Sequence, residues 1–550
     1  MIYDVVVVGG GIAGLMAAIE AKSSTNRVAI ITKGNLFKSN SSLASGGINA
    51  VLDPYDHGEL QKHMDDTLKS AAGLGDKKSI EYMCKRAPHI IKKLTEFGVE
   101  FDKDDAGNIA QRSFGGGSAK RTCYVGDKTG AAITQALIKH AKSLGVQFLV
   151  NNFIMNLALH HSKVSGVISL RRFDSSVVVY PVKAVILAGG GYAGIYRGFS
   201  TNAVDYTGDL LAIALRAGLR LQDMEFVQFH PTGFAKSSNL VSEAARGEGG
   251  YLVNDEGKRF VDELERRDVV SRAIAEQIEN GKKVFIDLRH LGKELIEKKL
   301  PSLYKSAFLQ AGIDLSEELL PIKPVAHYTM GGIEASNGVN TDIKGLFVCG
   351  ECAANGVHGA NRLGGNSLLE GAVFGELAGT RALAYSRAKD FYPIDYSKVI
   401  KDIELVDKIF DKDTSKNFNA MRISLGNMMF SGVGIKRNQE GLEKAYDYIS
   451  YLRSEVPTLH CIGKERTNNV ELVSILELRN VTEIAEAVIL SALKREESRG
   501  AHFRVDHDET NPKYAESIVV QELKKGILRV FLKEHKLLYK IRKIFNAKTN

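Results

Sequence analysis

The sequence predicts an α/β fold in which a domain built on a parallel sheet is split by an inserted domain and followed by a helical domain. Three observations lead to this prediction. The chain opens with a strand, a glycine-rich turn and a helix, and glycine-rich segments also end the strand-like runs at residues 184–191 and 345–351. Helical patterns dominate residues 393–511. With 550 residues, the chain is long enough for several domains.

The first predicted element is a buried strand of four valines at residues 5–8. A turn with Gly9, Gly11 and Gly14 leads into an alanine-rich helix, and a second strand follows at residues 28–31. In such a βαβ unit the first glycine permits a tight turn, the second lets a pyrophosphate approach the backbone, and the third lets the helix pack on the strand. The unit therefore predicts dinucleotide binding at the helix N-terminus, with a purely structural turn as the alternative.

The acidic residue that usually binds the ribose of a dinucleotide is missing. No carboxylate occurs between Glu20 and Asp53, and Lys33 occupies the expected place. The later glycine-rich segments, residues 184–191 and 345–351, read as further buried parallel strands that end at the same ligand. Three such loops suit one large dinucleotide.

The domain boundaries follow from these elements. We expect the first part of the dinucleotide-binding domain at residues 1–238, an inserted domain of mixed strands and helices at 239–333, and the second part at 334–392. A helical domain is expected at 393–511, and a basic hairpin and tail at 512–550. The hairpin prediction rests on apolar alternation on both sides of a Lys-Lys-Gly turn.

Composition argues against several classes of protein. The formal net charge is +8, but the last 27 residues contain nine Lys or Arg and one Glu, so the rest of the chain is neutral. A nucleic-acid binder would carry a basic face on its body, so nucleic acid is not an expected partner. Five scattered cysteines make no disulfide framework, and no signal peptide or membrane-spanning segment is recognisable. These features indicate a cytoplasmic protein.

One pair of cysteines has the spacing of a redox or metal-binding motif. Two residues separate Cys349 from Cys352, but no second pair accompanies them, and they stand at a strand end that faces the expected ligand. We therefore expect no metal site. The chain also lacks GxSxG, HExxH and Walker motifs.

Histidine and arginine gather beside glycines and turns in one part of the chain. Two His and two or three Arg with one hydroxyl can hold a small dianion, because a guanidinium group forks onto a carboxylate and keeps its charge. A single His is more often structural and a single Arg more often a surface charge, but five stretches within one region favour a site. These stretches are residues 229–233 (FHPTG), 242–250 (SEAARGEGG), 266–268 (RRD), 327–332 (HYTMGG) and 358–367 (HGANRLGGNS).

Together these motifs resemble those of the flavoprotein subunits of succinate dehydrogenase and fumarate reductase, a family that also includes L-aspartate oxidase. The resemblance covers nearly the full chain. Further matching stretches are ASGGI at residues 44–48, TGD at 207–209, RDVV at 267–270 and ESRGAH at 497–502. The resemblance implies FAD in a split Rossmann-type domain, an α+β capping domain that closes over a dicarboxylate, and a C-terminal helical domain.

The resemblance also implies which residues bind and convert the substrate. The two carboxylates of fumarate or succinate would be bound by His230, Ser242, His327 and Arg362. Hydride would pass between the flavin and one alkene carbon, while Arg267 would exchange a proton with the other carbon. Clamping both carboxylates would polarise the alkene and favour charge at the reacting carbons.

A relay and a cofactor site are implied in the same way. Glu243 and Arg246 would pass protons between Arg267 and solvent, because a guanidinium group is a poor acid unless it is reprotonated at once. If this segment is helical, the two relay residues share a face. The FAD contacts would be Gly9, Gly11, Ile12, Ala13, Gly14, Lys33, Asn40, Ser41, Gly46, Gly47, Asp209, Glu351, Ser367 and Leu368.

L-Aspartate oxidase, an enzyme of NAD biosynthesis, is the nearest alternative. Members with that activity carry a Glu for the substrate ammonium at the position of Phe114. A phenyl ring offers no charge partner to an ammonium group but can pack beside methylenes, so a dicarboxylate is favoured over an amino acid. A soluble single-chain fumarate reductase is a further alternative. A flavin-binding electron-transfer or scaffold protein without chemistry of its own is another, against which the intact His, Arg and Glu set argues.

The resemblance bears on how FAD is held. Membrane-bound members link a His covalently to the flavin, and the matching position here is Asn40. No His precedes His57, and an amide cannot form that bond. We therefore expect non-covalent FAD with a lower potential, which favours fumarate reduction.

Partners are expected because the chain has too few cysteines for an iron-sulfur cluster and no haem motif. The resemblance suggests a separate iron-sulfur subunit, and through it a peripheral position on the cytoplasmic face of a membrane. Three roles stay open for the basic tail: it docks that subunit, it is attracted to an anionic membrane surface, or it is a solvated hairpin.

Overall fold

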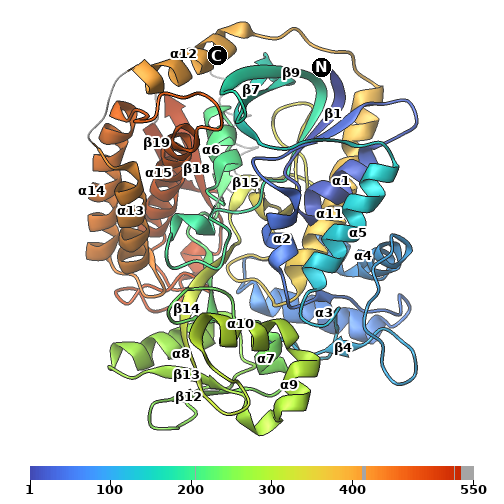
Figure 1. Ribbon diagram of the computed structural model, residues 1–550, viewed down its shortest axis with the longest axis vertical. Coiled ribbons are helices and arrows are strands. Elements are labelled where there is room, and N and C mark those ends of the chain that lie inside the picture. The colour runs from blue at the N-terminus through green and yellow to red at the C-terminus, as the bar shows by residue number, and fades with distance from the viewer. Residues whose placement is uncertain (205, 412–415, 525–526, 534–550) are drawn as a thin grey trace.

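The structure is a computed structural model that describes residues 1–204, 206–411, 416–524 and 527–533. Figure 1 shows three regions: a dinucleotide-binding domain around β1 and β9, a capping region around β12 to β14 at the lower end, and a helical region around α13 to α15 at one side. The α/β fold predicted from the sequence is confirmed. Residues 525–526 and 534–550 of the basic hairpin and tail lie outside the described residues.

A seven-stranded sheet forms the core of the dinucleotide-binding domain. Five strands are parallel, in the order β6-β2-β1-β9-β16, and the first half of the long strand β9 continues antiparallel through β8 to β7. The strands are β1 (Tyr3–Val8), β2 (Val28–Ile31), β6 (Gln147–Leu149), β7 (Asn152–His160), β8 (Lys163–Arg171), β9 (Ser176–Leu187) and β16 (Leu346–Val348).

The valines of β1 contact different layers on its two faces. Val5 and Val7 pack in a cluster with α1, α4, α5 and α11, whereas Val6 and Val8 pack with α6 and the helical region. A strand covered on both faces reads as a continuous apolar run, which explains the four successive valines. The helices of this domain are α1 (Ile12–Ala21), α2 (Asn40–Leu43), α3 (His57–Ser70), α4 (Lys77–Glu96), α5 (Thr129–Ser143), α6 (Asp209–Arg216) and α11 (Asn366–Arg387).

Helices α1 and α11 pack closely because small residues line their contact. A Cβ atom added at Gly375 would lie 2.5 Å from the backbone oxygen of Ala13, and one at Gly379 would lie 2.3 Å from that of Ala17. This packing aligns the N-termini of both helices with one cavity, described below. A small sheet beside α3 contains β3 (Ile48–Asn49), β4 (Gln111–Arg112) and β5 (Thr122–Cys123).

The capping region is a four-stranded antiparallel sheet, in the order β11-β14-β13-β12, with four helices. Strand β11 precedes residue 239, where we expected the inserted domain to begin, yet it pairs with β14 in this sheet. The elements are β11 (Val227–Phe234), α7 (Ala244–Gly247), β12 (Tyr251–Asn254), α8 (Arg267–Glu279), β13 (Val284–Asp287), α9 (Lys293–Lys299), α10 (Pro301–Ala311) and β14 (Leu320–Thr329).

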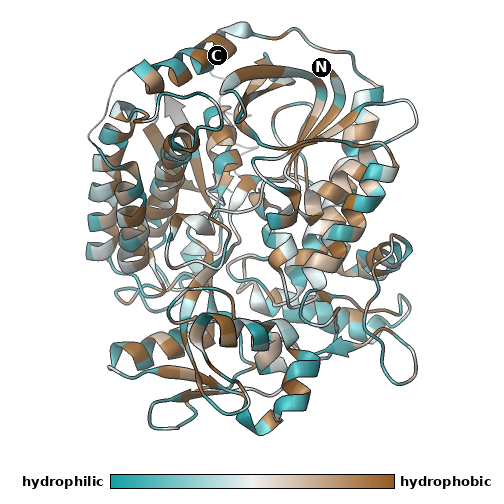
Figure 2. Ribbon diagram, viewed as in Figure 1, coloured by the Kyte–Doolittle hydropathy of each residue, from teal (hydrophilic) through white to brown (hydrophobic). Residues whose placement is uncertain are grey.

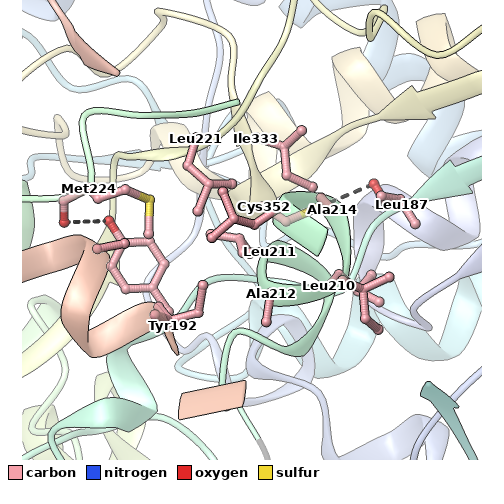
Figure 3. Close-up of a cluster of buried hydrophobic side chains, with 14 of the residues drawn as sticks. Leu187, Tyr192, Leu210, Leu211, Ala212, Ala214, Leu221, Met224, Ile333 and Cys352 are labelled. Atoms are coloured by element: carbon pink, nitrogen blue, oxygen red, sulfur yellow. Dashed lines mark hydrogen bonds between the residues drawn. The ribbon is translucent and has the colours of Figure 1, made fainter. Parts of the chain in front are cut away.

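The helical region packs against the far face of the main sheet. The two share one apolar cluster, and Figure 3 shows the part of it around α6, with Leu187, Leu211, Leu221 and Ile333. Figure 2 shows apolar residues along the buried strands and polar residues on outward helix faces. The helices are α12 (Tyr396–Asp411), α13 (Phe418–Val433), α14 (Gln439–Glu455) and α15 (Val470–Lys494).

The C-terminal hairpin is part of a mixed sheet, with its first strand buried and its second strand partly exposed. Strand β18 (Ile518–Lys524) pairs with β19 (Ile527–Leu532) and also with β10 (Leu221–Gln222). Its first three side chains are fully buried, so the interpretation of a solvated hairpin is wrong for this strand. The sheet is completed by β15 (Gly332–Glu334) and β17 (Ala353–Ala354).

Candidate active site

A deep cleft runs between the dinucleotide-binding domain and the capping sheet. Its main cavity is lined by the turn before α1, by α2 and the glycines after it, by the start of α11, and by side chains of the capping side. A neighbouring cavity continues it past Gly9, Gly10, Gly189 and Tyr206 toward the end of β2. The cleft is therefore elongated and joins two domains, as expected for a dinucleotide with a second ligand beside it.

The first glycine turn has no room for side chains. Gly9 has φ +118°, and a Cβ atom there would lie 2.1 Å from the backbone oxygen of Ala188. At Gly14 a Cβ atom would lie 2.0 Å from the oxygen of Gly9. The first turn of α1 contains no acidic side chain, and Ser41 accepts one of its N–H groups at 3.1 Å. This helix N-terminus therefore favours negative charge in the cleft.

Two histidines from neighbouring capping strands stand at the cavity. The rings of His230 on β11 and His327 on β14 have centroids 5.0 Å apart. In each ring Nδ1 faces a group of the protein. Nδ1 of His327 lies 2.7 Å from Oγ1 of Thr201, and Nδ1 of His230 lies 3.2 Å from the backbone nitrogen of Thr232. Burial lowers the pKa of both rings well below the ordinary range. Both imidazoles are therefore neutral, and Nε2 is the nitrogen available to a ligand.

Arg267 is the first residue of α8 and is held from two sides. Its Nε donates to Glu243 at 2.9 Å, its Nη2 also contacts Glu243, and its Nη1 donates to Gln228 at 3.0 Å. The same oxygen of Gln228 accepts from Nη2 of Arg362 at 3.2 Å. One buried amide therefore fixes both guanidinium groups. Sequence analysis missed Gln228, although its place two residues before His230 on a strand was an available signal.

Glu243 connects Arg267 to Arg246. Its Oε1 accepts from the backbone of Gly115 at 3.0 Å and lies 3.4 Å from Nη2 of Arg246. Burial by itself would raise the pKa of Glu243, but the charges of Arg267 and Arg246 outweigh it and lower the pKa to about 2. Residues 244–247 form the short helix α7, which places Glu243 and Arg246 on the same side. Arg246 is itself fully buried, and its Nη1 donates to the backbone oxygen of Glu263.

Buried guanidinium groups gather at the capping side of the cavity. Arg362 lies 4.3 Å from the ring centroid of Tyr328, and its Nε has no hydrogen-bond partner among the described residues. Burial and the nearby charge of Arg267 lower the pKa of Arg362 to about 9. Glu243 is the carboxylate that pairs with Arg246 and Arg267. Glu351 and Glu370 also line the cavity, but burial raises their pKa to about 7 and about 8, which weakens them as counter-charges. A ligand with two carboxylates would supply the missing negative charge.

Comparisons with known proteins agree with this geometry. Residues 4–368 match the FAD binding domain family, and residues 422–535 match the fumarate reductase flavoprotein C-terminal family. The succinate dehydrogenase flavoprotein subunit of Rickettsia bellii is 38% identical over 544 residues, covering 93% of this chain and 91% of that protein. The chain belongs to the succinate dehydrogenase and fumarate reductase flavoprotein family.

Two further relatives support this placement of the flavoprotein. One subunit of the fumarate reductase (CoM/CoB) of Methanothermobacter marburgensis is 37% identical, covering 94% of this chain and 96% of that protein. The FrdA chain of E. coli quinol fumarate reductase superposes with a TM-score of 0.93 at 32% identity, covering 98% of this chain and 97% of that one. The family, the fold and FAD-dependent oxidoreductase chemistry expected from the sequence are therefore confirmed.

Most residues expected to bind FAD line the main cavity of this flavoprotein. These are Gly9, Gly11, Ile12, Ala13, Asn40, Ser41, Gly46, Gly47, Glu351, Ser367 and Leu368. Lys33 and Asp209 line the neighbouring cavity, and Gly14 lines neither but packs under the turn. The glycine turn without room for Cβ atoms and the two helix N-termini fit the pyrophosphate and ring system of FAD.

Lys33 has partners that the sequence did not reveal. Its Nζ lies 2.8 Å from Oδ2 of Asp209 and 2.7 Å from Oε1 of Glu477 on α15. Burial alone would lower the pKa of Lys33, but the two carboxylates raise it above the ordinary value. The lysine in the place of the usual ribose acid therefore ties the end of β2 to α6 and to the helical region.

All four residues expected to bind substrate line the main cavity, as do Glu243 and Arg267, whereas Arg246 lies behind Glu243. Ser242 accepts the N–H of Ala244 at 3.3 Å. Side chains that sequence analysis missed include Thr201, Asn202, Tyr206, Tyr328 and Glu370, which line the same cavity. The described part of the chain contains no cluster of His, Cys, Asp or Glu suited to a metal ion, and Cys349 and Cys352 are buried free thiols.

Proposed function

We propose that this flavoprotein interconverts fumarate and succinate, with Arg267 as the proton donor or acceptor. The observation that carries the proposal is the excess of buried guanidinium charge beside two neutral histidines at the cavity that also receives the N-termini of α1 and α11. Such a site is incomplete without a small dianion.

The side chains divide the work between binding and proton transfer. FAD, when bound, supplies hydride exchange at the flavin ring. Arg362 binds one carboxylate of the substrate through its fork, and His230, His327 and Ser242 donate hydrogen bonds to the carboxylate oxygens. Clamping both ends twists the alkene and draws negative charge to the carbon that receives the proton.

Arg267 is suited to proton transfer because it is fixed before the substrate arrives. In fumarate reduction it would give a proton to one alkene carbon while the other carbon receives hydride. Glu243 contacts two of its nitrogens and would return the proton from Arg246 at once. In succinate oxidation the same groups would act in reverse.

An assay of the holoprotein with three substrates tests the proposal. Fumarate with a reduced dye and succinate with an oxidised dye should both turn over, and L-aspartate should be oxidised far more slowly. Phe114 supports this order because it lines the cavity at the position where a glutamate would be needed to meet the ammonium group of aspartate. Oxidation of L-aspartate at a rate comparable to fumarate reduction would establish the alternative, and an inactive protein that still binds FAD would support a scaffold role.

FAD is proposed to be held without a covalent bond. Asn40 lines the cavity, and its amide donates to Asn202 at 2.7 Å and accepts from the backbone of Ala203 at 3.1 Å. Acid precipitation should release the flavin into the supernatant. Flavin fluorescence on the protein band after denaturing electrophoresis would contradict this expectation.

An iron-sulfur subunit is the proposed electron partner, because curated relatives are named as subunits. Removal of residues 536–550, which lie outside the described residues, should reduce co-purification of an iron-sulfur protein if the tail docks it. A full-length protein that purifies alone from its source and turns over with free flavin or a nicotinamide would instead be a soluble reductase. No helix among the described residues has the length and apolar content needed to cross a membrane.

A further inference from the structure

A second large cavity lies away from the FAD cleft, under helix α12. It is bounded by α12, by β7, by the C-terminal end of α14 and by the middle of α15. Its volume is about 560 Å³, and none of its lining residues lines the FAD cleft. This volume falls within the range of about 300–1,000 Å³ that is typical of pockets for small organic ligands.

The wall of this cavity carries a concentrated positive charge. Its six cationic side chains are Arg216, Lys398, Lys401, Lys408, Arg453 and Arg479, and its two carboxylates are Asp402 and Glu483. Arg453 also pairs with Glu486. The remaining excess of three positive charges stands in a chain whose body, without the last 27 residues, has no net charge. The cavity is therefore a local feature and not one part of a generally basic surface.

The available carboxylates are already engaged. Glu483 is 2.5 Å from Nη1 of Arg216 and 3.5 Å from Nε of Arg479. Asp402 is buried and accepts two hydrogen bonds from Asn156, at 2.7 and 3.0 Å. Burial raises the pKa of Asp402, which weakens it as a counter-charge.

The three lysines of α12 have no carboxylate within ion-pair distance in the described part of the chain. Lys401 and Lys408 are exposed at the rim, and Lys398 is partly buried. Lys398 and Lys401 are three residues apart on one helix, so their ammonium groups repel each other, and Asp395 and Asp402 offset only part of this repulsion from beyond ion-pair distance. A ligand with several negative charges would remove this repulsion.

The floor of the cavity is apolar. It contains Leu405 and Ile409 of α12, Ile475 and Leu476 of α15, and Val456 and Leu459 after α14. An inorganic anion would leave this floor uncovered, whereas a ligand with a flat or apolar body would cover it while its charged end met the lysines.

We propose that this cavity binds an organic polyphosphate such as a nucleoside triphosphate. Phosphate oxygens bind both ammonium and guanidinium groups, and a triphosphate carries enough charge to balance the excess at this site. The nucleobase packs on the apolar floor. The site is separate from the FAD cleft and does not depend on the proposed reaction.

Calorimetric titration of the FAD-loaded protein with ATP tests the proposal, because bound FAD blocks its own adenosine site. Adenosine and inorganic tripolyphosphate serve as comparison ligands. We expect ATP to bind at least tenfold more tightly than either, with an affinity that falls as salt is raised. Tripolyphosphate that binds as tightly as ATP would reveal a charge cluster without a site for an organic body and would overturn the proposal.

Two charge-reversal variants distinguish ATP binding at this cavity from attraction of ATP by the overall charge of the protein. Lys401→Glu with Lys408→Glu should weaken ATP binding at least tenfold. The double variant Lys78→Glu with Lys139→Glu makes the same change in charge at two exposed helical lysines away from both cavities. It should change the affinity for ATP less than twofold. Circular dichroism and FAD content check that each variant is folded.

Three outcomes contradict the proposal. One is the absence of ATP binding at millimolar concentration, and another is equal weakening in both variants. The third is binding of the wild type to vesicles of anionic phospholipid that the first variant loses and that ATP does not displace. That result would assign the lysines to a membrane surface.

Discussion

Two groups of buried arginines in this protein differ in how their charges are balanced. At the cavity, Arg362 and Arg267 share one amide oxygen of Gln228, and Glu243 is the carboxylate they have in common nearby. Burial and the charge of Arg267 lower the pKa of Arg362 to about 9. The cavity group is therefore under-compensated as long as no anionic ligand is bound.

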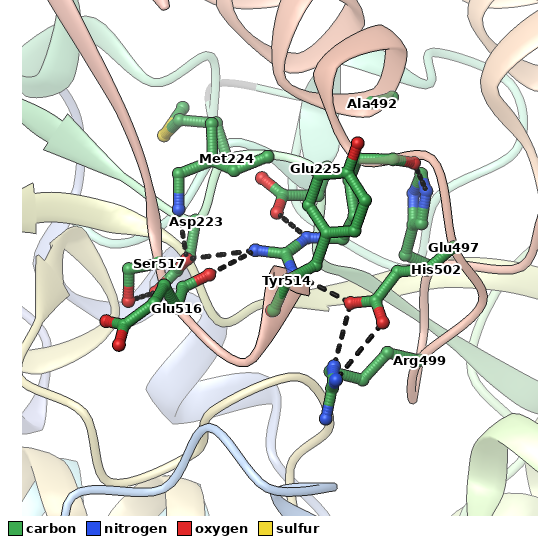
Figure 4. A network of polar contacts seen from close by, with 12 residues as sticks. Asp223, Met224, Glu225, Ala492, Glu497, Arg499, His502, Tyr514, Glu516 and Ser517 are labelled. Atoms are coloured by element: carbon green, nitrogen blue, oxygen red, sulfur yellow. Dashed lines mark hydrogen bonds and ion pairs between the residues drawn. The ribbon is translucent and has the colours of Figure 1, made fainter. Parts of the chain in front are cut away.

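The second group is centred on Arg495 and is closed, meaning that its cation is fully paired; Figure 4 labels its carboxylates Glu225 and Glu497. Nε of Arg495 lies 2.5 Å from Glu225, and its Nη1 donates to Glu497 at 2.9 Å. Backbone oxygens of Tyr514 and Glu516 accept from its remaining N–H groups at 2.8 and 3.0 Å. Burial would lower the pKa of Arg495, but the carboxylates of Glu225 and Asp223 outweigh it and raise the pKa.

The difference separates a binding site from a structural joint. A buried cation with all its partners stabilises one arrangement of the chain, here the junction of α15, β18 and the start of β11. A buried cation without enough partners lowers stability, and it is expected where a bound ligand supplies the missing counter-charge. Substitutions at the two groups should therefore have opposite profiles for stability and for activity.

The largest effect is expected at Arg267. Arg267→Lys keeps the charge but loses the fork that contacts Glu243 and Gln228, so FAD and dicarboxylate should still bind while turnover falls roughly 10²–10⁴-fold. Single-turnover kinetics with succinate measures this loss. Arg266→Lys, at the neighbouring and partly exposed position, is the matched control and should remain active. Retention of most turnover by Arg267→Lys would remove Arg267 from its role as proton donor.

Loss of the closed group should affect stability more than chemistry. Arg495→Met leaves Glu225 buried without its cation, while Glu497 keeps Arg499. The loss of this buried pair should cost about 3–5 kcal/mol of unfolding free energy. Thermal unfolding followed by circular dichroism checks this. Arg171→Met removes a cation whose side chain is 49% exposed and should change stability by at most about 1 kcal/mol. Equal melting temperatures for the two variants would contradict the comparison.

Arg362→Met replaces a buried arginine at the cavity in the same way as Arg495→Met does in the closed group. It should weaken succinate binding by about 1.5–3 kcal/mol, because it removes hydrogen bonds to a charged ligand. Without succinate it should destabilise the protein less than Arg495→Met, since it also removes an uncompensated charge. Melting temperatures of both variants, with and without saturating succinate, test the two halves of this expectation. A larger loss of stability for Arg362→Met without ligand would show that the cavity group is as well balanced as the closed one.

The smallest effect concerns pH. Burial lowers the pKa of His327 and of His230, so the unfolded chain binds protons below about pH 6.5 that the folded chain does not. Stability without ligand should therefore fall as pH is lowered from 6.5 to 5.5, by at most about 1.4 kcal/mol per pH unit for each such histidine.

Succinate should reduce this fall, because a dianion favours protonated imidazoles. In His327→Asn, succinate should have a smaller effect on the slope of stability against pH than in the wild type. The control is His502→Asn: His502 is a buried neutral histidine of the closed region, and its Nδ1 lies 2.8 Å from Nη1 of Arg437. This variant should keep the full effect of succinate. An identical dependence of stability on pH with and without succinate would show that succinate does not favour the protonated imidazoles.

Sequence alone determined the features that depend on local constraints. The four valines of β1 and the glycines at 9, 11 and 14 predict a strand, a tight turn and a helix, because burial on both faces and the exclusion of Cβ atoms act within a few residues. Likewise, His230, Ser242, His327 and Arg362 stand in stretches whose composition marks them, and the structure places all four at one cavity.

Tertiary structure alone decided which partners these residues have. Gln228 joins Arg267 to Arg362, Lys33 pairs with Glu477 of α15, and β18 is buried beside β10. No pattern in the sequence encodes these pairings, because the partners come from distant segments that meet only when the capping region and the helical region pack on the dinucleotide-binding domain. The balance of charge, which separates the cavity arginines from the closed group, is a property of that meeting and is absent from any local stretch of the chain.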